Sequence, residues 1–179
     1  MRATFFENNH IILRAVEPDD LELLYLWEND TQLWSVGNTR IPYSKFALKQ
    51  YIAQSHQDIY ESKQLRLMIV DISSNVPIGT VDLFDFEPHH SRIAFGLFVA
   101  PQHQGKGIAK MALSLLDDYV FSFLKINQLY CHIAASNTAS RTMFEQQNYL
   151  QSGYLHHWIK TINGYEDIIV FQLLNNQNK

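Results

Sequence analysis

The loop Val99-Ala100-Pro101-Gln102-His103-Gln104-Gly105-Lys106-Gly107-Ile108-Ala109 decides the fold of this 179-residue chain. It follows an apolar segment, 92–99, that is typical of a strand, and it leads into a helical pattern from about 107 to 124. Glycine lets the backbone approach a ligand closely, and a helix start offers unpaired N–H groups and a positive dipole end. We therefore expect the loop to hold a pyrophosphate, with Lys106 adding a positive charge. An ordinary turn is the alternative, because neither the dinucleotide nor the P-loop fingerprint is present.

Strand and helix patterns lie on both sides of this loop. Before it, they predict a strand over 10–16, helices over 18–28 and 44–60, and a hairpin of strands 65–72 and 76–86. After it, they predict a strand over 129–134, a helix over 138–147, and strands 149–160 and 165–174 joined by an Asn163-Gly164 turn. Gly96, inside the 92–99 strand, indicates a bulge or a close backbone approach. This order predicts a mixed α/β sheet with helices on its faces.

The composition narrows the class of protein. Hydrophobic residues make up 46% of the chain, which excludes a disordered or collagen-like protein. No internal repeat or linker is present, so we expect one domain over 1–179, with 175–179 as a frayed tail. No apolar run reaches the roughly 18 residues of a membrane helix, and no secretory signal pattern opens the chain. The single cysteine, Cys131, excludes an intrachain disulfide framework and a cysteine-rich zinc site, so we expect a cytoplasmic protein without a membrane partner.

Charge is unevenly distributed along the chain. The net charge of −4 disfavours a general nucleic-acid surface. Between Arg14 and Arg40 there is no Lys or Arg, and aromatic residues alternate with carboxylates. The six carboxylates are Glu17, Asp19, Asp20, Glu22, Glu28 and Asp30, and the aromatic residues among them are Tyr25, Trp27 and Trp34. Two interpretations stay open: a solvated helix face, or an acidic, aromatic lip that attracts a cationic ligand.

Two motifs resemble the GNAT superfamily of acyl-CoA-dependent N-acetyltransferases. Gln104, Gly107 and Ala109 match its Gln/Arg-x-x-Gly-x-Gly/Ala motif. A second family pattern, which runs from an asparagine to a Gly-Phe pair, appears downstream as Asn137, Ser140, Met143, Phe144, Glu145, Asn148 and Tyr149. The resemblance covers essentially the whole chain and is greatest to bacterial spermidine N-acetyltransferases and, a little further off, ribosomal-protein N-terminal acetyltransferases. It implies a single mixed, mostly antiparallel sheet, splayed around an acyl-CoA cleft with helices on both faces.

The resemblance also implies a set of acetyl-CoA-binding residues. The backbone of Phe98 and Val99 would pair with the pantetheine arm, and Asn137 and Ser140 would flank it further down. The residues that would wrap the pyrophosphate are Gln104, Gly105, Lys106, Gly107, Ile108 and Ala109. From the residues alone, Asn137 is equally well a helix N-cap, and Gln104 an exposed loop residue.

Three positions depart from the family pattern. Asn148 replaces a glycine, which is mild because asparagine tolerates a left-handed helix end. Phe144, which the resemblance places at the cofactor, replaces a tyrosine thought to protonate the departing thiolate. Ala94 stands where spermidine-type relatives tend to carry a glutamate.

A base would be important for acetyl transfer, because an amine with a pKa of about 10.4 is almost wholly protonated at pH 7. The candidate bases are Asp82, Asp85, Glu87, His89, His90, His132, His156 and His157. We favour Asp82, since its predicted strand is near the cofactor strand, and a surface-facing carboxylate is the alternative. Adjacent histidines point apart on a strand, so we expect no metal site.

The expected activity is acetyl transfer from acetyl-CoA, used as a co-substrate, to a primary amine by direct attack on the thioester. The expected acceptor is a polyamine or another small cationic amine, because of the acidic segment and the resemblance. The alternatives are a protein N-terminal acetyltransferase and a non-catalytic acyl-CoA-binding module. We expect a small-molecule amine as partner, neither nucleic acid nor membrane, and leave homo-oligomerisation open.

Overall fold

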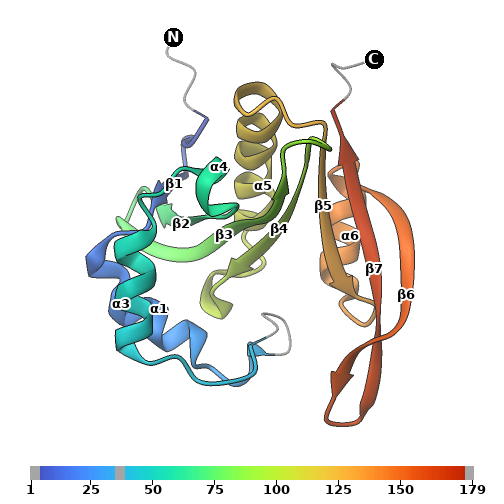
Figure 1. Ribbon diagram of the computed structural model, residues 1–179, viewed down its shortest axis with the longest axis horizontal. Coiled ribbons are helices and arrows are strands. Elements are labelled where there is room, and N and C mark those ends of the chain that lie inside the picture. The colour runs from blue at the N-terminus through green and yellow to red at the C-terminus, as the bar shows by residue number, and fades with distance from the viewer. Residues whose placement is uncertain (1–4, 35–38, 176–179) are drawn as a thin grey trace.

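Seven strands in the order β1-β2-β3-β4-β5-β7-β6 make one mixed sheet in the computed structural model, which describes residues 5–34 and 39–175 (Figure 1). The strands are β1 (Ile11–Ala15), β2 (Leu65–Asp71), β3 (Val76–Glu87), β4 (Arg92–Val99), β5 (Gln128–Ala134), β6 (Leu150–Thr161) and β7 (Gly164–Leu174). Their bounds follow the expected strands closely, including the hairpin turn before Gly164. The mixed α/β sheet predicted from the order of patterns is confirmed.

The helices are α1 (Leu21–Glu28), α3 (Lys45–Gln54), α4 (Ile59–Ser62), α5 (Ile108–Asp118) and α6 (Thr138–Gln146). The short 3-10 turns are η1 (Pro18–Asp20) and η2 (Pro101–His103), and the π-helix η3 (Tyr119–Phe123) directly continues α5. The single helix expected over 44–60 is two helices. Its first part ends at Ser55, and Asp58 starts the second by accepting a hydrogen bond from the Tyr60 N–H at 2.6 Å. Local capping thus divides a segment whose apolar spacing alone predicts one helix.

The sheet opens between its two central strands. β4 and β5 are parallel and pair only from Arg92–Gln128 to Ala94–Tyr130. Beyond that pair both strands continue while separating, as Figure 1 shows. We call the unpaired stretches, 95–99 of β4 and 131–134 of β5, the fork. The splayed sheet implied by the resemblance is therefore present.

The bulge expected at Gly96 is absent. Gly96 lies opposite Asp82 in regular register with β3, and the register shifts further along, between Phe84 and Glu87. Asp85 has a φ of 49° inside that shift. The backbone irregularity therefore sits near the β3–β4 turn, away from the fork.

Helices cover both faces of the sheet. On one side, which we call the α1 face, Met68 and Val70 of β2 pack with Leu24 of α1 and Ile52 of α3. On the other side, the α5 face, a larger buried cluster joins the strands to α5 and α6. Its best-buried members include Ile69, Leu83, Ile93, Phe95, Leu113, Leu116 and Phe171. Because side chains alternate along a strand, each strand near the fork presents one set of residues to each face.

The end of the chain departs from the expected frayed tail at one residue. Asn175 is buried, and its N–H donates to the carbonyl of Asn127 at 2.8 Å. Residues 176–179 of that expected tail lie outside the described residues. Within 5–34 and 39–175, no helix is long and apolar enough to cross a membrane.

Candidate active site

The loop between β4 and α5 is braced from within. Gln104 donates from Nε2 to the carbonyl of Val99 at 2.9 Å, which ties the loop back to the last residue of β4. The short turn η2 occupies the residues between them. Gln104 is therefore an exposed loop residue, as the alternative expects, whose side chain also has a structural role in the loop.

Two glycines give the loop its path. Gly105 has a φ of 74° and Gly107 a φ of 77°, a left-handed conformation that side-chain-bearing residues adopt only at a cost. A Cβ added at either would meet nothing within 4 Å. Here the space beside the backbone is open, so an approaching ligand finds no side chain in its way.

The start of α5 suits an anion. Gly107 is its N-cap and supplies no side-chain hydrogen bond, so the first N–H groups of the helix keep their usual need for a partner. Ile108 is buried and fixes the first turn against the core, while Lys106 is exposed beside it. Backbone donors, a positive dipole end and one cation fit a pyrophosphate. The geometry thus agrees with the cofactor expected from the sequence.

The fork contributes strand edges without partners on one side. Phe98 and Val99 are bound to β3 through Thr80 and Gly79, and the β4–β5 pairing has ended before them. The Phe98 ring packs edge-on against Trp27 of α1 at 5.1 Å. This edge of β4 is available for an extended ligand such as a pantetheine arm.

The N-cap interpretation of Asn137 is confirmed. Its Oδ1 accepts a hydrogen bond from the Ser140 N–H at 3.0 Å and so starts α6. Lys110 of α5 donates to Gln146 of α6 at 2.5 Å and links the two helices across the α5 face. Capping leaves the amide N–H groups of Asn137 and the second lone pair of its Oδ1 for a ligand such as pantetheine.

Phe144 is a core residue. It is 3% exposed, and its ring lies 5.8 Å from that of Phe95, 5.3 Å from that of Tyr149 and 5.9 Å from that of Phe171. The phenyl ring therefore packs among other rings and offers no proton donor. Its expected place at the cofactor stays a prediction.

Asp82 is engaged in an ion pair. It lies between Arg66 of β2 and Gly96 of β4 in the sheet register, on the α1 face. Its Oδ1 accepts a hydrogen bond from Arg66 Nε, and its Oδ2 accepts one from the Thr80 hydroxyl at 3.3 Å. The favoured base thus stands beside the fork, as expected, but with both carboxylate oxygens occupied.

Arg66 was not singled out by the sequence analysis. It also donates to Glu28 of α1, and its guanidinium lies 5.5 Å from the ring of Tyr51 on α3. Burial lowers the pKa of Arg66, but the charges of Asp82 and Glu28 outweigh this and raise the pKa, so the guanidinium stays charged. The predicted 65–72/76–86 hairpin was the available signal, since it brings residues 66 and 82 nearly opposite each other.

Half of the carboxylates in the acidic segment form ion pairs. Asp20 accepts two hydrogen bonds from Arg14, at 2.7 and 2.8 Å. Both carboxylate oxygens of Glu22 lie 2.7 Å from Lys45 Nζ, which donates to them. With Glu28 bound to Arg66, three of the six carboxylates have cationic partners. Glu17, Asp19 and Asp30 are exposed and, among the residues that the structure describes, form no ion pair. The segment is thus partly an ion-paired helix face, and it keeps an excess of negative charge.

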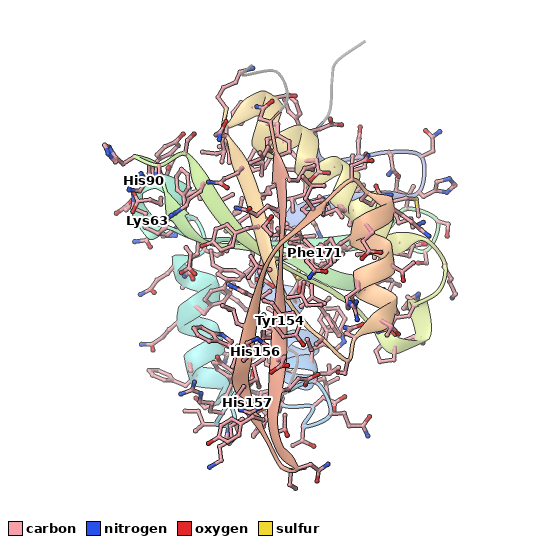
Figure 2. All side chains as sticks on the ribbon, turned by 90° about the vertical axis from the view of Figure 1, so that its right-hand side faces the viewer. Lys63, His90, Tyr154, His156, His157 and Phe171 are labelled. Carbon is pink, nitrogen blue, oxygen red and sulfur yellow. The ribbon has the colours of Figure 1, made fainter. Side chains whose placement is uncertain are left out.

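The candidate histidines fall into three groups in different parts of the sheet: the β3–β4 turn, β5 and β6. His90 lies in the turn between β3 and β4, and His156 and His157 lie on β6 near the β6–β7 turn (Figure 2). His132 alone is in β5, at the fork. In the part of the chain that the structure describes, no group of three or more His, Cys, Asp or Glu residues could hold a metal ion.

Known proteins share both the sequence and this fold. Residues 10–148 match the acetyltransferase (GNAT) domain family. The spermidine N(1)-acetyltransferase of Vibrio cholerae is 27% identical over 161 residues, which are 90% of this chain and 91% of the relative. A crystal structure of the Vibrio cholerae enzyme with CoA and spermine superposes with a TM-score of 0.84 at 26% identity, covering 94% of this chain and 97% of that one.

A dodecameric structure of the same Vibrio cholerae enzyme, in an intermediate state, has a TM-score of 0.78 at 26% identity and covers 96% of this chain and 97% of the other. The fork, the glycine loop at the start of α5 and the family match over most of the chain agree with one another. This chain belongs to the GNAT acetyltransferase family and is an enzyme of acetyl transfer.

Proposed function

We propose that this enzyme moves the acetyl group of acetyl-CoA onto a primary amine of a polyamine. The observation that carries the proposal is the glycine loop at the end of β4. Gly105 and Gly107 leave open space beside the unpartnered start of α5, directly after the fork. A phosphate-bearing thioester would there have its phosphates at a helix start and its arm along a strand edge.

The proposed cofactor site has two parts. The loop residues that would surround the pyrophosphate are Gln104, Gly105, Lys106, Gly107, Ile108 and Ala109. The arm would run along Phe98 and Val99 and pass Asn137 and Ser140 at the start of α6. When bound, acetyl-CoA supplies the activated acetyl group, and the chain's own residues bind and orient it.

Polyamine as acceptor is supported by two observations. The Vibrio cholerae relative is named for spermidine, and its crystal structure holds spermine together with CoA. On the α1 face of this chain, Glu28, Arg66 and Asp82 together carry one negative charge in excess, beside the side-chain-free strand at Gly96. A cationic amine that approaches the fork from this face would be attracted by that excess.

The remaining proposals concern domain organisation, location in the cell and oligomeric state. A single domain over 1–179, a cytoplasmic place of action and a homo-oligomer are the arrangement that we propose, the last supported by the dodecameric Vibrio cholerae structure.

Thiol release from acetyl-CoA tests the function. The panel contains spermidine, spermine, simple monoamines and peptides with free N-termini. We expect polyamines to release thiol fastest, and CoA alone to raise the unfolding midpoint because it binds only the native state. Turnover of peptides alone would establish an N-terminal acetyltransferase instead. A CoA-dependent rise in midpoint without thiol release from any amine would establish a binding module.

A further inference from the structure

The register of β5 puts His132 on the α1 face of the fork. Tyr130 lies opposite Ala94 in the last β4–β5 pair, and residues that pair in a sheet point to the same face. Side chains alternate along a strand, so His132, two residues further on, shares the face of Tyr130. The two rings meet edge-on with centroids 5.9 Å apart, and His132 is exposed. The imidazole therefore stands on the β5 side of the fork.

The β4 side of the fork leaves room opposite this imidazole. A Cβ added to Gly96 would touch only a ring carbon of Phe84 at 3.7 Å, so the space over the strand is otherwise clear. The carboxylate of Asp82, next to Gly96, is already bound to Arg66 and Thr80. In residues 5–34 and 39–175, by contrast, no hydrogen bond or ion pair involves the His132 imidazole.

We propose that His132 is the general base that takes the proton from the acceptor amine. This rests on the proposed acetyl transfer. Ala94 stands where spermidine-type relatives tend to carry a glutamate, and an alanine cannot act as a base, so His132 would fill that role. The ammonium gives one proton to the neutral imidazole, and the freed nitrogen lone pair attacks the thioester carbonyl carbon. The C–S bond then breaks, the second nitrogen proton goes to the CoA thiolate as the amide forms, and the imidazolium returns its proton to water.

Several titratable groups share this face and could affect the same pH range. On β5 the neighbour is Tyr130. Burial and the charge of Asp85 raise the pKa of its hydroxyl, and the charge of Arg92 lowers it by a smaller amount. On the β3–β2 side they are Asp82, Arg66 and, from the covering helices, Glu28 and Tyr51. β7 presents the uncharged Val170 and Gln172 opposite β5.

The experiment compares pH profiles of kcat/KM for spermidine in the unaltered enzyme, His132→Gln, Asp82→Asn and, as a matched control, His10→Gln. His10 is exposed ahead of β1, at the far edge of the sheet. An ordinary imidazole titrates near pH 6.5 and a carboxylate near pH 4. We therefore expect the unaltered enzyme and His10→Gln to share the same acid limb followed by a plateau, and His132→Gln to lose that limb.

For His132→Gln we expect kcat/KM at pH 7 to fall about 100-fold or more. Its rate should then rise steadily up to the pKa of the amine, because only free amine can react. The unfolding midpoint of His132→Gln and its rise with CoA should stay unchanged. In a further variant, His132→Ala, added imidazole should restore part of the rate. These last two results separate a lost base from a damaged fold.

Two results overturn the inference. One is an unchanged profile in His132→Gln, and the other is a shift of the acid limb in Asp82→Asn but not in His132→Gln. An enzyme that binds CoA but acetylates no amine contradicts the proposed function itself, and this is seen before any variant is made.

Discussion

Asp117 of α5 is a carboxylate held in a setting that disfavours its charge. The hydroxyl of Tyr149 donates to its Oδ1 at 2.7 Å, and Tyr149 itself is 2% exposed. Burial raises the pKa of Asp117 to about 7, against the smaller opposing effect of the Tyr149 hydrogen bond. At neutral pH this group is therefore near half-protonated in the folded protein.

The first prediction concerns stability against pH. An unfolded aspartate titrates near 3.9, so between about pH 4 and 7 the unfolded chain releases this proton while the folded one keeps it. The stability contributed by Asp117 is complete below pH 4 and is lost as the pH rises through 7, by at most about 4 kcal/mol.

Asp117→Asn keeps an acceptor for the Tyr149 hydroxyl but carries no charge. The free energy of unfolding of this variant, relative to that of the unaltered protein, should therefore increase from pH 5 to 8. Denaturant titrations across that range measure it, with the exposed Asp19→Asn as control, because Asp118 itself contributes to the raised pKa of Asp117. Parallel pH curves for the unaltered protein and Asp117→Asn would show that burial of this carboxylate has no such cost.

The second prediction concerns Gly107. Substituting it separates two effects of an added Cβ: strain in the backbone, and occupation of the space that the ligand would need. Gly107→Ala and Gly164→Ala both force alanine into a positive φ, 77° and 130°, at a cost of about 1–2 kcal/mol or more. Both variants should therefore unfold at lower temperature. Only Gly107→Ala should weaken CoA about tenfold, because its Cβ occupies the space beside the start of α5. Calorimetric titration with CoA measures the affinity. Equal CoA affinities in the two variants would contradict a role of the loop in CoA binding.

At the scale of elements, Arg66 connects three parts of the structure that are distant in sequence. It lies in β2, bonds to Asp82 of β3 and Glu28 of α1, and lies beside Tyr51 of α3. Its side chain is 20% exposed, and those of Glu28 and Asp82 are 21% and 27% exposed. Apolar packing places α1 over the sheet, and this charged group holds its C-terminal end.

The third prediction compares two ion pairs of α1. Arg66→Met leaves two half-buried carboxylates facing each other without a cation, which should cost about 3 kcal/mol. Lys45→Met removes an exposed partner, whose Glu22 is 68% exposed, and should cost less than about 1 kcal/mol. Chemical denaturation measures both. Similar losses in the two variants would mean that Arg66 contributes no more than a surface pair.

At the scale of the whole molecule, charge should govern how the acceptor arrives. The chain carries a net charge of −4, and the group of Glu28, Arg66 and Asp82 lies beside the fork with one negative charge in excess. A polyamine with several positive charges responds to that field more strongly than a monoamine does.

The fourth prediction follows from screening. The Debye length falls from about 10 Å at 0.1 M salt to about 3 Å at 1 M. KM for spermidine should therefore rise several-fold over that range, while KM for a monoamine substrate changes little. Unfolding midpoints at each salt concentration control for changes in the protein. A spermidine KM that is independent of salt would contradict attraction by these carboxylates.

The order of strands and helices and the position of the glycine loop could be predicted from the sequence because they depend on local patterns. Alternating apolar residues, turn residues such as Asn163-Gly164, and glycines before a helix act within a few positions. The fork could be expected only through the family resemblance, and the place of Asp85 in the bulge could not, since register depends on the partner strand.

Contacts between distant segments were decided by the tertiary structure alone. From the sequence, Asp82 was the favoured base and the segment from Glu17 to Asp30 was acidic. No local pattern indicated that Arg66 pairs with Asp82 and with Glu28 of that segment, or that Lys45 pairs with its Glu22. Nor could the sequence place His132 on the α1 face of the sheet, across the fork from Gly96, because that follows from which strands pair and where their pairing stops. Helix caps and the Arg14–Asp20 ion pair form between residues a few positions apart, whereas the ion pairs of Arg66 and Lys45 and the geometry of the site arise only when the fold brings remote residues together.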